Sequence, residues 1–395
     1  MAASLAVHTV KDVSTSVPQW DELALYVHWP FCVSKCPYCD FNSHVRDSVD
    51  QAAWCEALLT DLGHEARLLP GKRLTSIFFG GGTPSLMEPA TAGAIIEAAQ
   101  RHWQAGEGIE ITLEANPSSV EAARFAELAA AGVNRVSLGL QSLDNQALAF
   151  LGRAHGVSEG LGALETAQRH FRRVSFDLIY ALPGQRMGEW DAMLGRALGF
   201  GTGHLSLYQL TIEPGTRFAT MAARHEFAPL DADESAEMFE LTQERTAAAG
   251  LPLYEISNHS RPGDESRHNL TYWRYRDYAG VGPGAHGRRL GQRTVRHRKP
   301  ENFLSAISRN GHGIVEEERL TAREAAHEAL VMGLRLAEGI DPQSLAERLG
   351  VGRIVDDEAV GRLKKLGLLQ SSGARLSLTP EGRLLLDSIL GEIAA

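Results

Sequence analysis

The sequence is poor in cysteine, with four in 395 residues, which excludes a disulfide-based scaffold. It also lacks any apolar run of the roughly 18 residues that a membrane-spanning helix needs. The first residues, MAASLAVHTVKDV, contain neither a basic segment nor a sustained apolar segment, so we expect no secretory signal. These absences favour a reducing cytoplasmic location, where clustered cysteines serve metal binding or catalysis.

Positive charge is not in surplus either, because 39 Lys and Arg stand against 49 Asp and Glu, a net charge of −10. Binding to nucleic acid relies on excess Lys and Arg, so we expect no nucleic-acid partner. Hydrophobic residues at 44% and charged residues at 22% are typical of a globular protein. At about 150 residues per domain, the length predicts two or three domains.

Three of the four cysteines, Cys32, Cys36 and Cys39, lie within eight residues in a C-x3-C-x2-C pattern. Cys55 stands apart in a helical stretch, where we expect it to pack as a small apolar residue. A structural zinc site needs four ligands, and no second cysteine pair supplies them. Three thiolates without an obvious fourth favour an iron–sulfur cluster, with zinc as the alternative. A four-iron cluster held in this way has one iron left open to a substrate or cofactor.

Strand-like runs and helical stretches alternate between residues 23 and 212, which predicts parallel β–α–β units. The runs are nearly continuously apolar, as expected for strands covered on both faces. This layout fits either a doubly wound sheet or a barrel. In both, chemistry gathers at the carboxyl ends of the strands. The predicted strands span residues 23–29, 76–82, 110–115, 135–142, 173–184 and 204–212.

The cysteine spacing, with Tyr38 directly before the third cysteine, resembles the signature of the radical S-adenosylmethionine (SAM) superfamily. The resemblance implies an α/β fold, a partial (β/α)6 barrel open at one side. It also implies a [4Fe-4S] cluster whose open iron is chelated by the amino and carboxylate groups of SAM. One electron from the cluster then breaks a carbon–sulfur bond of SAM and gives a 5′-deoxyadenosyl radical.

Further polar and glycine residues stand at the predicted strand ends. The run Gly80–Pro84 resembles a motif that contacts the SAM amino group. Asp177 lies inside an apolar strand, which is costly for a carboxylate without a partner. Arg153 suits a forked pair with the SAM carboxylate. The residues that the resemblance implies for SAM binding are Tyr26, Tyr38, Gly81, Gly82, Thr83, Glu114, Gln141, Arg153 and Asp177.

From about Leu23 to Asp341 the amino-acid sequence resembles the coproporphyrinogen dehydrogenase-like branch of the superfamily. Segments that carry the resemblance include YVHWPFC, LEANP and GVGPGAH. The dehydrogenases carry another cysteine two residues after the third, where this chain has Phe41. The chain therefore resembles the heme chaperone (HemW) subfamily. That resemblance implies binding of heme, an unidentified heme-acceptor protein, and an electron donor for the cluster.

The segment HNLTYW at residues 268–273 matches an HNxxYW motif of that subfamily, and imidazole is a common axial ligand of heme iron. His268 is therefore the predicted heme ligand, and His286 is a weaker alternative. The basic run at residues 296–299 is expected on a solvated face, with binding of porphyrin propionates as a minor option.

Three other functions stay open. The chain could decarboxylate coproporphyrinogen as a dehydrogenase, although Phe41 counts against this. It could cleave or alkylate heme by radical chemistry. A DNA regulator is disfavoured by the acidic composition. The expected domains are a lead at 1–20, the barrel at 21–230, a connecting region with the HNxxYW motif at 231–314, and a mostly helical, winged-helix-like domain at 315–395.

Overall fold

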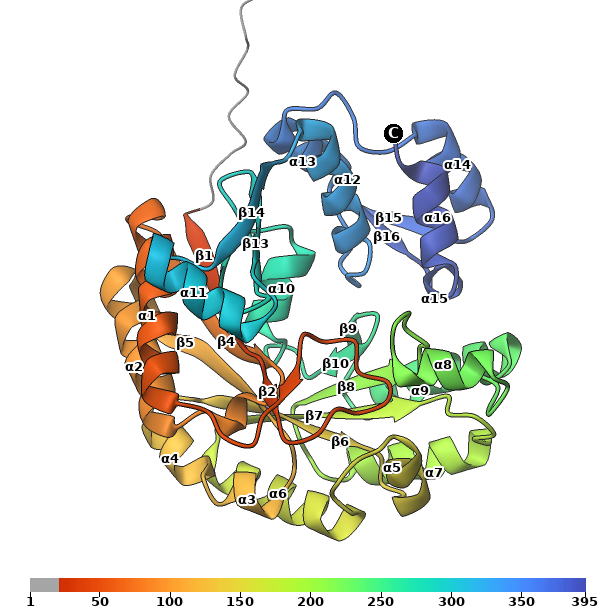
Figure 1. Ribbon diagram of the computed structural model, residues 1–395. Coiled ribbons are helices and arrows are strands. Elements are labelled where there is room, and N and C mark those ends of the chain that lie inside the picture. Colours follow the sequence, from red (N-terminus) through yellow and green to blue (C-terminus); the bar gives the residue numbers. More distant parts are fainter. Residues whose placement is uncertain (1–20) are drawn as a thin grey trace, which may run out of the picture.

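The computed structural model describes residues 21–395, so the lead expected at residues 1–20 lies outside the described chain. Six parallel strands lie side by side in chain order at the centre of one sheet (Figure 1). The last does not pair with the first, so the barrel is open, as the resemblance implied. The strands are β1 (Glu22–Trp29), β4 (Arg73–Gly81), β5 (Gln104–Ala115), β6 (Arg135–Gln141), β7 (Arg173–Tyr180) and β8 (His204–Gln209).

Helices cover the outer side of these strands (Figure 1). The helical stretch between β5 and β6 is divided in two, because the chain turns at Ala123 and Arg124. The Arg124 side chain there donates to the Met87 carbonyl oxygen at 3.1 Å. The helices are α1 (Gln51–Leu68), α2 (Pro89–His102), α3 (Ser119–Ala122), α4 (Phe125–Ala130), α5 (Asn145–Phe150), α6 (Val157–His170) and α7 (Met187–Leu198).

The sheet extends beyond the six strands on both sides, and the sequence did not predict most of this extension. β11 (Tyr278–Val281) pairs in parallel with β1, and three antiparallel strands follow it. At the other edge, β10 pairs with β8. The remaining added strands are β12 (His286–Arg289), β13 (Gln292–Arg296), β14 (Ile314–Arg319), β9 (Leu253–Glu255) and β10 (Asn258–Ser260). Residues expected to connect two domains therefore continue the sheet.

A buried cluster of four charges holds this added edge against α1. Arg296 donates to Asp61 at 2.6 Å and to Glu65 at 2.8 Å, and Arg289 donates to Glu65 at 2.6 Å. Asp61 also accepts from the backbone N–H groups of Gly282 and Gly313. The expectation of a solvated face at residues 296–299 is thus wrong for Arg296, which is 0% exposed. Its charge is tolerated because two carboxylates surround it.

The C-terminal part has its own apolar core, formed by helices around a two-stranded hairpin. This agrees with the mostly helical character predicted for the C-terminal residues, and the chain ends in two short helices. The elements are α12 (Ala322–Gly333), α13 (Pro342–Leu349), α14 (Asp357–Lys365), β15 (Leu369–Ser372), β16 (Arg375–Leu378), α15 (Pro380–Arg383) and α16 (Leu386–Ile393).

Helix α10 (Arg267–Trp273) connects the two parts of the chain. Its residues contact both β4 of the barrel and α12 of the C-terminal part. Directly after it, Tyr275 is buried in the C-terminal core and has a positive φ of 53°. The Trp273 ring lies 4.6 Å from the Arg335 guanidinium. The two parts are therefore packed together through this segment.

The connections between these elements are also helical. After β8 come α8 (Arg217–Ala223) and α9 (Ala232–Ala248), and α11 (Pro300–Asn310) lies between β13 and β14. No helix within residues 21–395 combines the length and the apolar character needed to cross a membrane.

The buried charge cluster makes a prediction about stability. Arg296→Gln leaves Asp61 and Glu65 buried without their main cation, so we expect a loss of about 3–5 kcal/mol in the free energy of unfolding. The matched control is Arg293→Gln on the same strand, whose partner is Glu318 and whose side chain is 45% exposed. Such an exposed pair contributes about 0–1 kcal/mol. Thermal and urea unfolding of both variants measure the difference, and equal losses would contradict a special role for the cluster.

Candidate functional site

The segment that carries the three cysteines lies across the carboxyl ends of the parallel strands (Figure 1). Two short strands, β2 (Phe31–Cys32) and β3 (His44–Val45), pair with each other and close the segment into a loop. A cavity of about 440 Å³ lies beneath it. All predicted site residues except Tyr26 and His268 line this first cavity: Cys32, Cys36, Tyr38, Cys39, Gly81, Gly82, Thr83, Glu114, Gln141, Arg153 and Asp177.

The three thiols are free and half-buried in the cavity wall. Burial raises the pKa of Cys32 and Cys39, and the neighbouring thiols raise it further. No group of three His, Cys, Asp or Glu side chains in the described chain forms a site for a single metal ion. In a four-iron cluster each cysteine binds a different iron, so the cysteine sulfur atoms need not converge on a single metal position. The donor set of three thiols around a cavity fits such a cluster.

The glycine run at the end of β4 packs closely against the cysteine loop. The backbone N–H groups of Gly81, Gly82 and Thr83 donate to the Glu114 carboxylate and to the carbonyl oxygens of Trp29 and Phe31. A Cβ atom on Gly82 would lie 2.6 Å from the Phe31 carbonyl oxygen. The glycines therefore let the cysteine loop approach the strand, and the backbone N–H groups of Gly81, Gly82 and Thr83 are already hydrogen bonded within the protein.

A chain of hydrogen bonds joins two of the cysteines across the cavity. Thr83 donates to the Cys32 sulfur at 3.4 Å and accepts from the Asn116 amide at 3.0 Å. Arg153 donates to the Asn116 oxygen at 2.6 Å and to the Cys36 sulfur at 3.5 Å. Sequence reasoning did not single out Asn116, although the LEANP segment contains it. It is a residue of the candidate site that only the structure reveals, through its hydrogen bonds in the cavity lining.

Arg153 keeps unused donor capacity in the cavity wall. Its Nε atom is buried and has no hydrogen-bond partner among residues 21–395. A buried guanidinium N–H without a partner is costly, and a carboxylate in the cavity would satisfy it. This orphaned donor fits the carboxylate of an amino-acid ligand such as SAM.

Two carboxyl groups lie on the barrel side of the cavity. Burial raises the pKa of Glu114 to about 8, and the nearby charge of Asp177 adds to the shift. Burial raises the pKa of Asp177 to about 6, against hydrogen bonds from Ser206 and Ser137 that lower it. Adjacent buried acids with raised pKa values are typical of a site that receives a cation. The ammonium or sulfonium group of SAM would supply one.

Gln141 ends β6 in a strained conformation, with a φ of 65°. Non-glycine residues rarely adopt this region, and such strain is concentrated at functional sites. A Cβ atom on Gly139 would lie 2.7 Å from the Gln141 Nε2 atom, so the glycine makes room for the amide. The strain turns this amide toward the cavity that it lines.

A second cavity, of about 480 Å³, adjoins the first, and Phe41, Gly81 and Glu114 line both. Tyr26 and His268 lie here instead of in the first cavity. The lining includes five Tyr or Phe side chains, three histidines and one arginine. The set is Tyr26, His28, Asp40, Phe41, Asn42, Phe78, Gly81, Glu114, His268, Asn269, Tyr272, Tyr278, Gly284, His286 and Arg298.

Both ring nitrogens of His268 are hydrogen bonded. Nδ1 lies 3.0 Å from the Ser76 hydroxyl, and Nε2 lies 2.6 Å from the Tyr272 hydroxyl. The ring also stacks on Phe78, with centroids 4.9 Å apart. Burial lowers the pKa of His268 to about 3, so the imidazole is neutral. A neutral ring can bind iron, but Nε2 must first lose its contact with Tyr272.

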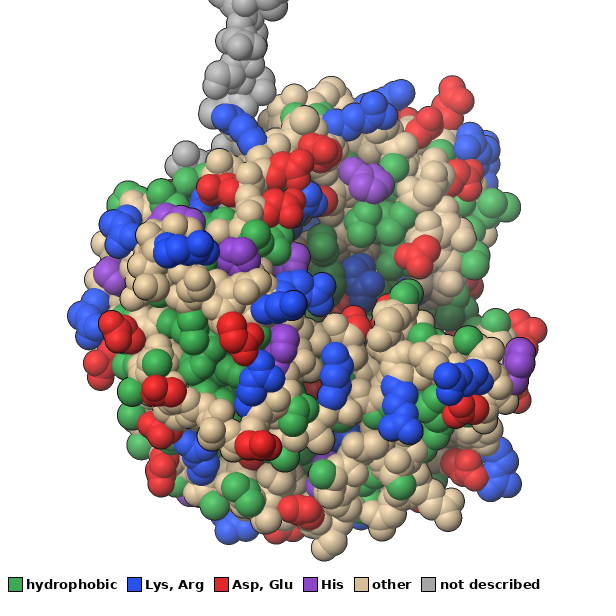
Figure 2. Space-filling view, in the orientation of Figure 1, with side chains coloured by type: hydrophobic (Ala, Val, Ile, Leu, Met, Phe, Trp, Pro, Cys, Tyr) green, Lys and Arg blue, Asp and Glu red, His purple; other side chains and the backbone are tan. Residues whose placement is uncertain are grey.

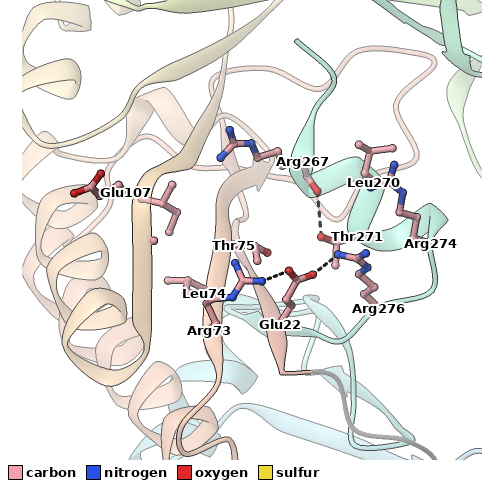
Figure 3. Close-up of a pocket in the computed structure, with 12 residues that line it drawn as sticks. Glu22, Arg73, Leu74, Thr75, Glu107, Arg267, Leu270, Thr271, Arg274 and Arg276 are labelled. Atoms are coloured by element: carbon pink, nitrogen blue, oxygen red, sulfur yellow. Dashed lines mark hydrogen bonds and ion pairs between the residues drawn. The ribbon is translucent and has the colours of Figure 1, made fainter. Parts of the chain in front are cut away.

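A smaller cavity, of about 270 Å³, lies at the opposite ends of β1, β4 and β5 (Figure 3). Four arginines line it, and the Glu22 carboxylate bridges Arg73 and Arg276. It contains none of the predicted site residues. Because the chemistry of parallel barrels gathers at the carboxyl ends of the strands, we place the candidate site in the first two cavities.

The surface around the cavities is mixed in charge. Acidic and basic side chains are interspersed over the face shown in Figure 2, which is hollowed between the barrel and the C-terminal helices. Phe41 is 59% exposed although it lines both cavities, so it lies at their common opening.

Comparison with known proteins gives concordant matches. The family model of the radical SAM superfamily matches residues 26–197, and that of the HemN C-terminal domain matches residues 320–385. The Bos taurus mitochondrial radical S-adenosyl methionine domain-containing protein 1 is 39% identical, covering 94% of this chain and 87% of its own. Heme chaperone HemW of Escherichia coli is 36% identical, covering 93% and 97%. HemW of Bacillus subtilis is 32% identical, also covering 93% and 97%.

Among solved structures, coproporphyrinogen III oxidase (HemN) of Escherichia coli, a radical SAM enzyme, matches with a TM-score of 0.78. The match covers 95% of this chain and 91% of that chain at 21% sequence identity. A likeness at this identity shows a common fold and leaves the substrate open.

The raised pKa of Glu114 predicts a pH effect on stability in the absence of SAM. The folded protein keeps the Glu114 proton that the unfolded chain releases near pH 4.5, so the contribution of this group to stability falls as pH rises toward about 8. Glu114→Gln removes this loss, and we expect the variant to gain melting temperature relative to the wild type at pH 8 but not at pH 5.

The control is Glu159→Gln, which lies in the wall of the same cavity. A backbone hydrogen bond from Ser119 lowers the pKa of this exposed carboxylate, so it stays ionised from pH 5 to pH 8. Its effect on melting temperature should not change over that interval. A Glu114→Gln effect that is the same at both pH values would contradict the assignment.

Proposed function

Because the chain belongs to the HemW family of heme chaperones, within the radical SAM superfamily, we propose that it binds heme beside a [4Fe-4S] cluster and SAM and passes the heme to an acceptor protein. The observation that carries this proposal is the pair of adjoining cavities. One is lined by three cysteines and polar strand ends, and the other by aromatic side chains and histidines. Gly81, Glu114 and Phe41 line both cavities.

In the first cavity, Cys32, Cys36 and Cys39 hold the cluster, which supplies an iron with an open coordination position and an electron. Arg153 binds the SAM carboxylate through its free Nε–H. The remaining predicted residues orient the amino group, the ribose and the adenine-bearing part. These are Tyr38, Gly81, Gly82, Thr83, Glu114, Gln141 and Asp177, and Asn116 fixes Thr83 and Arg153 in place. Tyr26 contributes from the second cavity, where its hydroxyl lies 2.9 Å from His28 Nδ1.

In the second cavity, the aromatic side chains would hold the heme ring and His268 would bind its iron. Tyr272 holds the His268 Nε2 atom in the structure, and iron binding at that atom would require this contact to open. Ser76 keeps its contact with Nδ1 and so orients the ring. Heme can therefore bind at His268 only if the bond between its iron and Nε2 is strong enough to displace the short hydrogen bond from Tyr272.

Decarboxylation of coproporphyrinogen is the second candidate function. The structural likeness to HemN favours it at the level of the fold. The exposed Phe41 disfavours it, because the dehydrogenases carry a cysteine at that position. A protein that converts coproporphyrinogen to protoporphyrinogen would overturn the chaperone proposal in favour of this one.

The partners follow from the same proposal. They are heme, a heme-acceptor protein and an electron donor, and we propose no nucleic-acid partner, in line with the interspersed charges in Figure 2. The four free thiols suit a reducing compartment, for which we propose the cytoplasm.

The two matched regions support a barrel domain at 21–230 and a C-terminal domain at 315–395. They leave residues 231–314, with α10 and the added strands, as a third region between them.

The cluster assignment predicts a brown protein after anaerobic purification, whose visible absorbance falls on reduction with dithionite. Changing Cys32, Cys36 or Cys39 to Ala should abolish this absorbance and the bound iron. Cys55→Ala is the control, because that cysteine lies on α1 away from the lining of the cavity. Zinc in place of iron in the anaerobic protein would contradict the cluster.

Heme titration tests the second cavity. His268→Ala should weaken heme binding by about tenfold or more, a loss of about 1.4 kcal/mol, and shift the Soret band. Tyr272→Phe removes the hydroxyl that occupies Nε2, so it should bind heme at least as tightly as the wild type. A purely structural histidine gives a different result, in which Tyr272→Phe weakens binding and His268→Ala leaves the Soret band unchanged.

A further inference from the structure

The mouth of the second cavity carries a cation whose position is fixed by the cysteine loop. Arg298 follows β13 and lines the cavity. Its carbonyl oxygen accepts from the Asn42 amide at 2.9 Å and lies 3.2 Å from His44 Nε2. Asn42 also donates to the Pro283 carbonyl oxygen at 3.0 Å. The backbone at Arg298 is thus tied to the loop that covers the cluster.

The guanidinium of Arg298 is available to a ligand. Among residues 21–395, no hydrogen bond or ion pair of this side chain is found, whereas Arg46 and Arg293 nearby in the fold are paired with Glu301 and Glu318. Asp40 lines the same cavity without forming an ion pair with Arg298. The protein has more acidic than basic residues, with a net charge of −10, and yet this cation at the entrance of the cavity has no acidic partner in the described part of the chain.

The other walls of the cavity show what kind of ligand the cation faces. Tyr26, Phe78, Tyr272 and Tyr278 give an aromatic interior, with the Tyr272 and Tyr278 rings 4.6 Å apart and perpendicular. His28 and His286 line the same cavity, where burial lowers the pKa of both rings and the charge of Arg298 lowers it further. A ligand that fits is flat and apolar, with an anionic group at one edge.

Heme has this shape, because both of its propionates lie on one edge of the ring. We propose that Arg298 binds a heme propionate at the mouth of the second cavity and thereby sets the orientation of the bound heme. The propionate edge then faces the opening beside Phe41, and the opposite edge enters first, toward His268. This inference rests on the proposed heme binding and adds a specificity: the cavity prefers tetrapyrroles with free carboxylates.

Heme titration with two ligands tests the inference on the full-length, cluster-loaded protein. Hemin carries free propionates, and hemin dimethyl ester carries the same ring with both carboxylates blocked. Arg298→Gln should weaken hemin binding by about tenfold, as expected for the loss of a charge-assisted contact. It should leave the affinity for the dimethyl ester unchanged. Arg298→Lys keeps the charge with fewer donors and should fall between the wild type and Arg298→Gln.

Lys299→Gln is the matched control, because it removes the same charge from the next residue, which does not line the cavity. An equal loss in this variant would show a general effect of surface charge and would overturn the inference. So would an equal loss for hemin and its ester, or no loss for Arg298→Gln. Melting temperature and cluster absorbance verify that each variant is folded and loaded. Wild-type protein that binds no hemin would overturn the proposed function as well, whereas unaltered hemin binding by Arg298→Gln overturns only this inference.

Discussion

The buried charges between α1 and the added edge of the sheet are the constraint on which the site depends. Asp61 fixes the backbone at Gly282 and Gly313, and Arg296 joins Asp61 to Glu65. Pro283, directly after the first of these glycines, accepts a hydrogen bond from Asn42 in the cysteine loop. The buried charges therefore also help to fix the position of the loop that carries the three cysteines. Charge pairs of this kind are costly to desolvate, so they need not add much to stability. Their role here is to fix the position of the added strands relative to α1.

Much of the barrel could be predicted from the sequence. Its strands are long apolar runs with clear breaks, and the local pattern agrees with the final structure. The added strands β11 to β14 could not be predicted, because they are short and carry arginines such as Arg288, Arg289 and Arg296. Arg289 and Arg296 are buried because they pair with Glu65 and Asp61 on α1, which lie more than two hundred residues earlier in the chain. No local pattern contains that information.

In the candidate site, too, some features could be predicted from the sequence and others could not. Cysteine spacing and the polar strand ends predicted the lining of the first cavity, because side chains at the carboxyl ends of parallel strands meet at one edge. The sequence did not separate Tyr26 from the other predicted SAM residues, since the division into two cavities depends on how Phe41, Gly81 and Glu114 pack. It also gave no sign that Gly82 lets backbone segments approach closely, because the contact with Phe31 depends on how the cysteine loop folds over β4.

Helix α10 has a consequence for the way the C-terminal part is understood. His268 and Tyr272, in one part of the helix, line the second cavity, while Trp273 and Tyr275 at its end pack against the C-terminal part. The C-terminal helices thus support α10, and α10 in turn supplies His268 and Tyr272 to the cavity wall. A displacement of these helices would move α10 and change the shape of the second cavity, although they do not line it themselves.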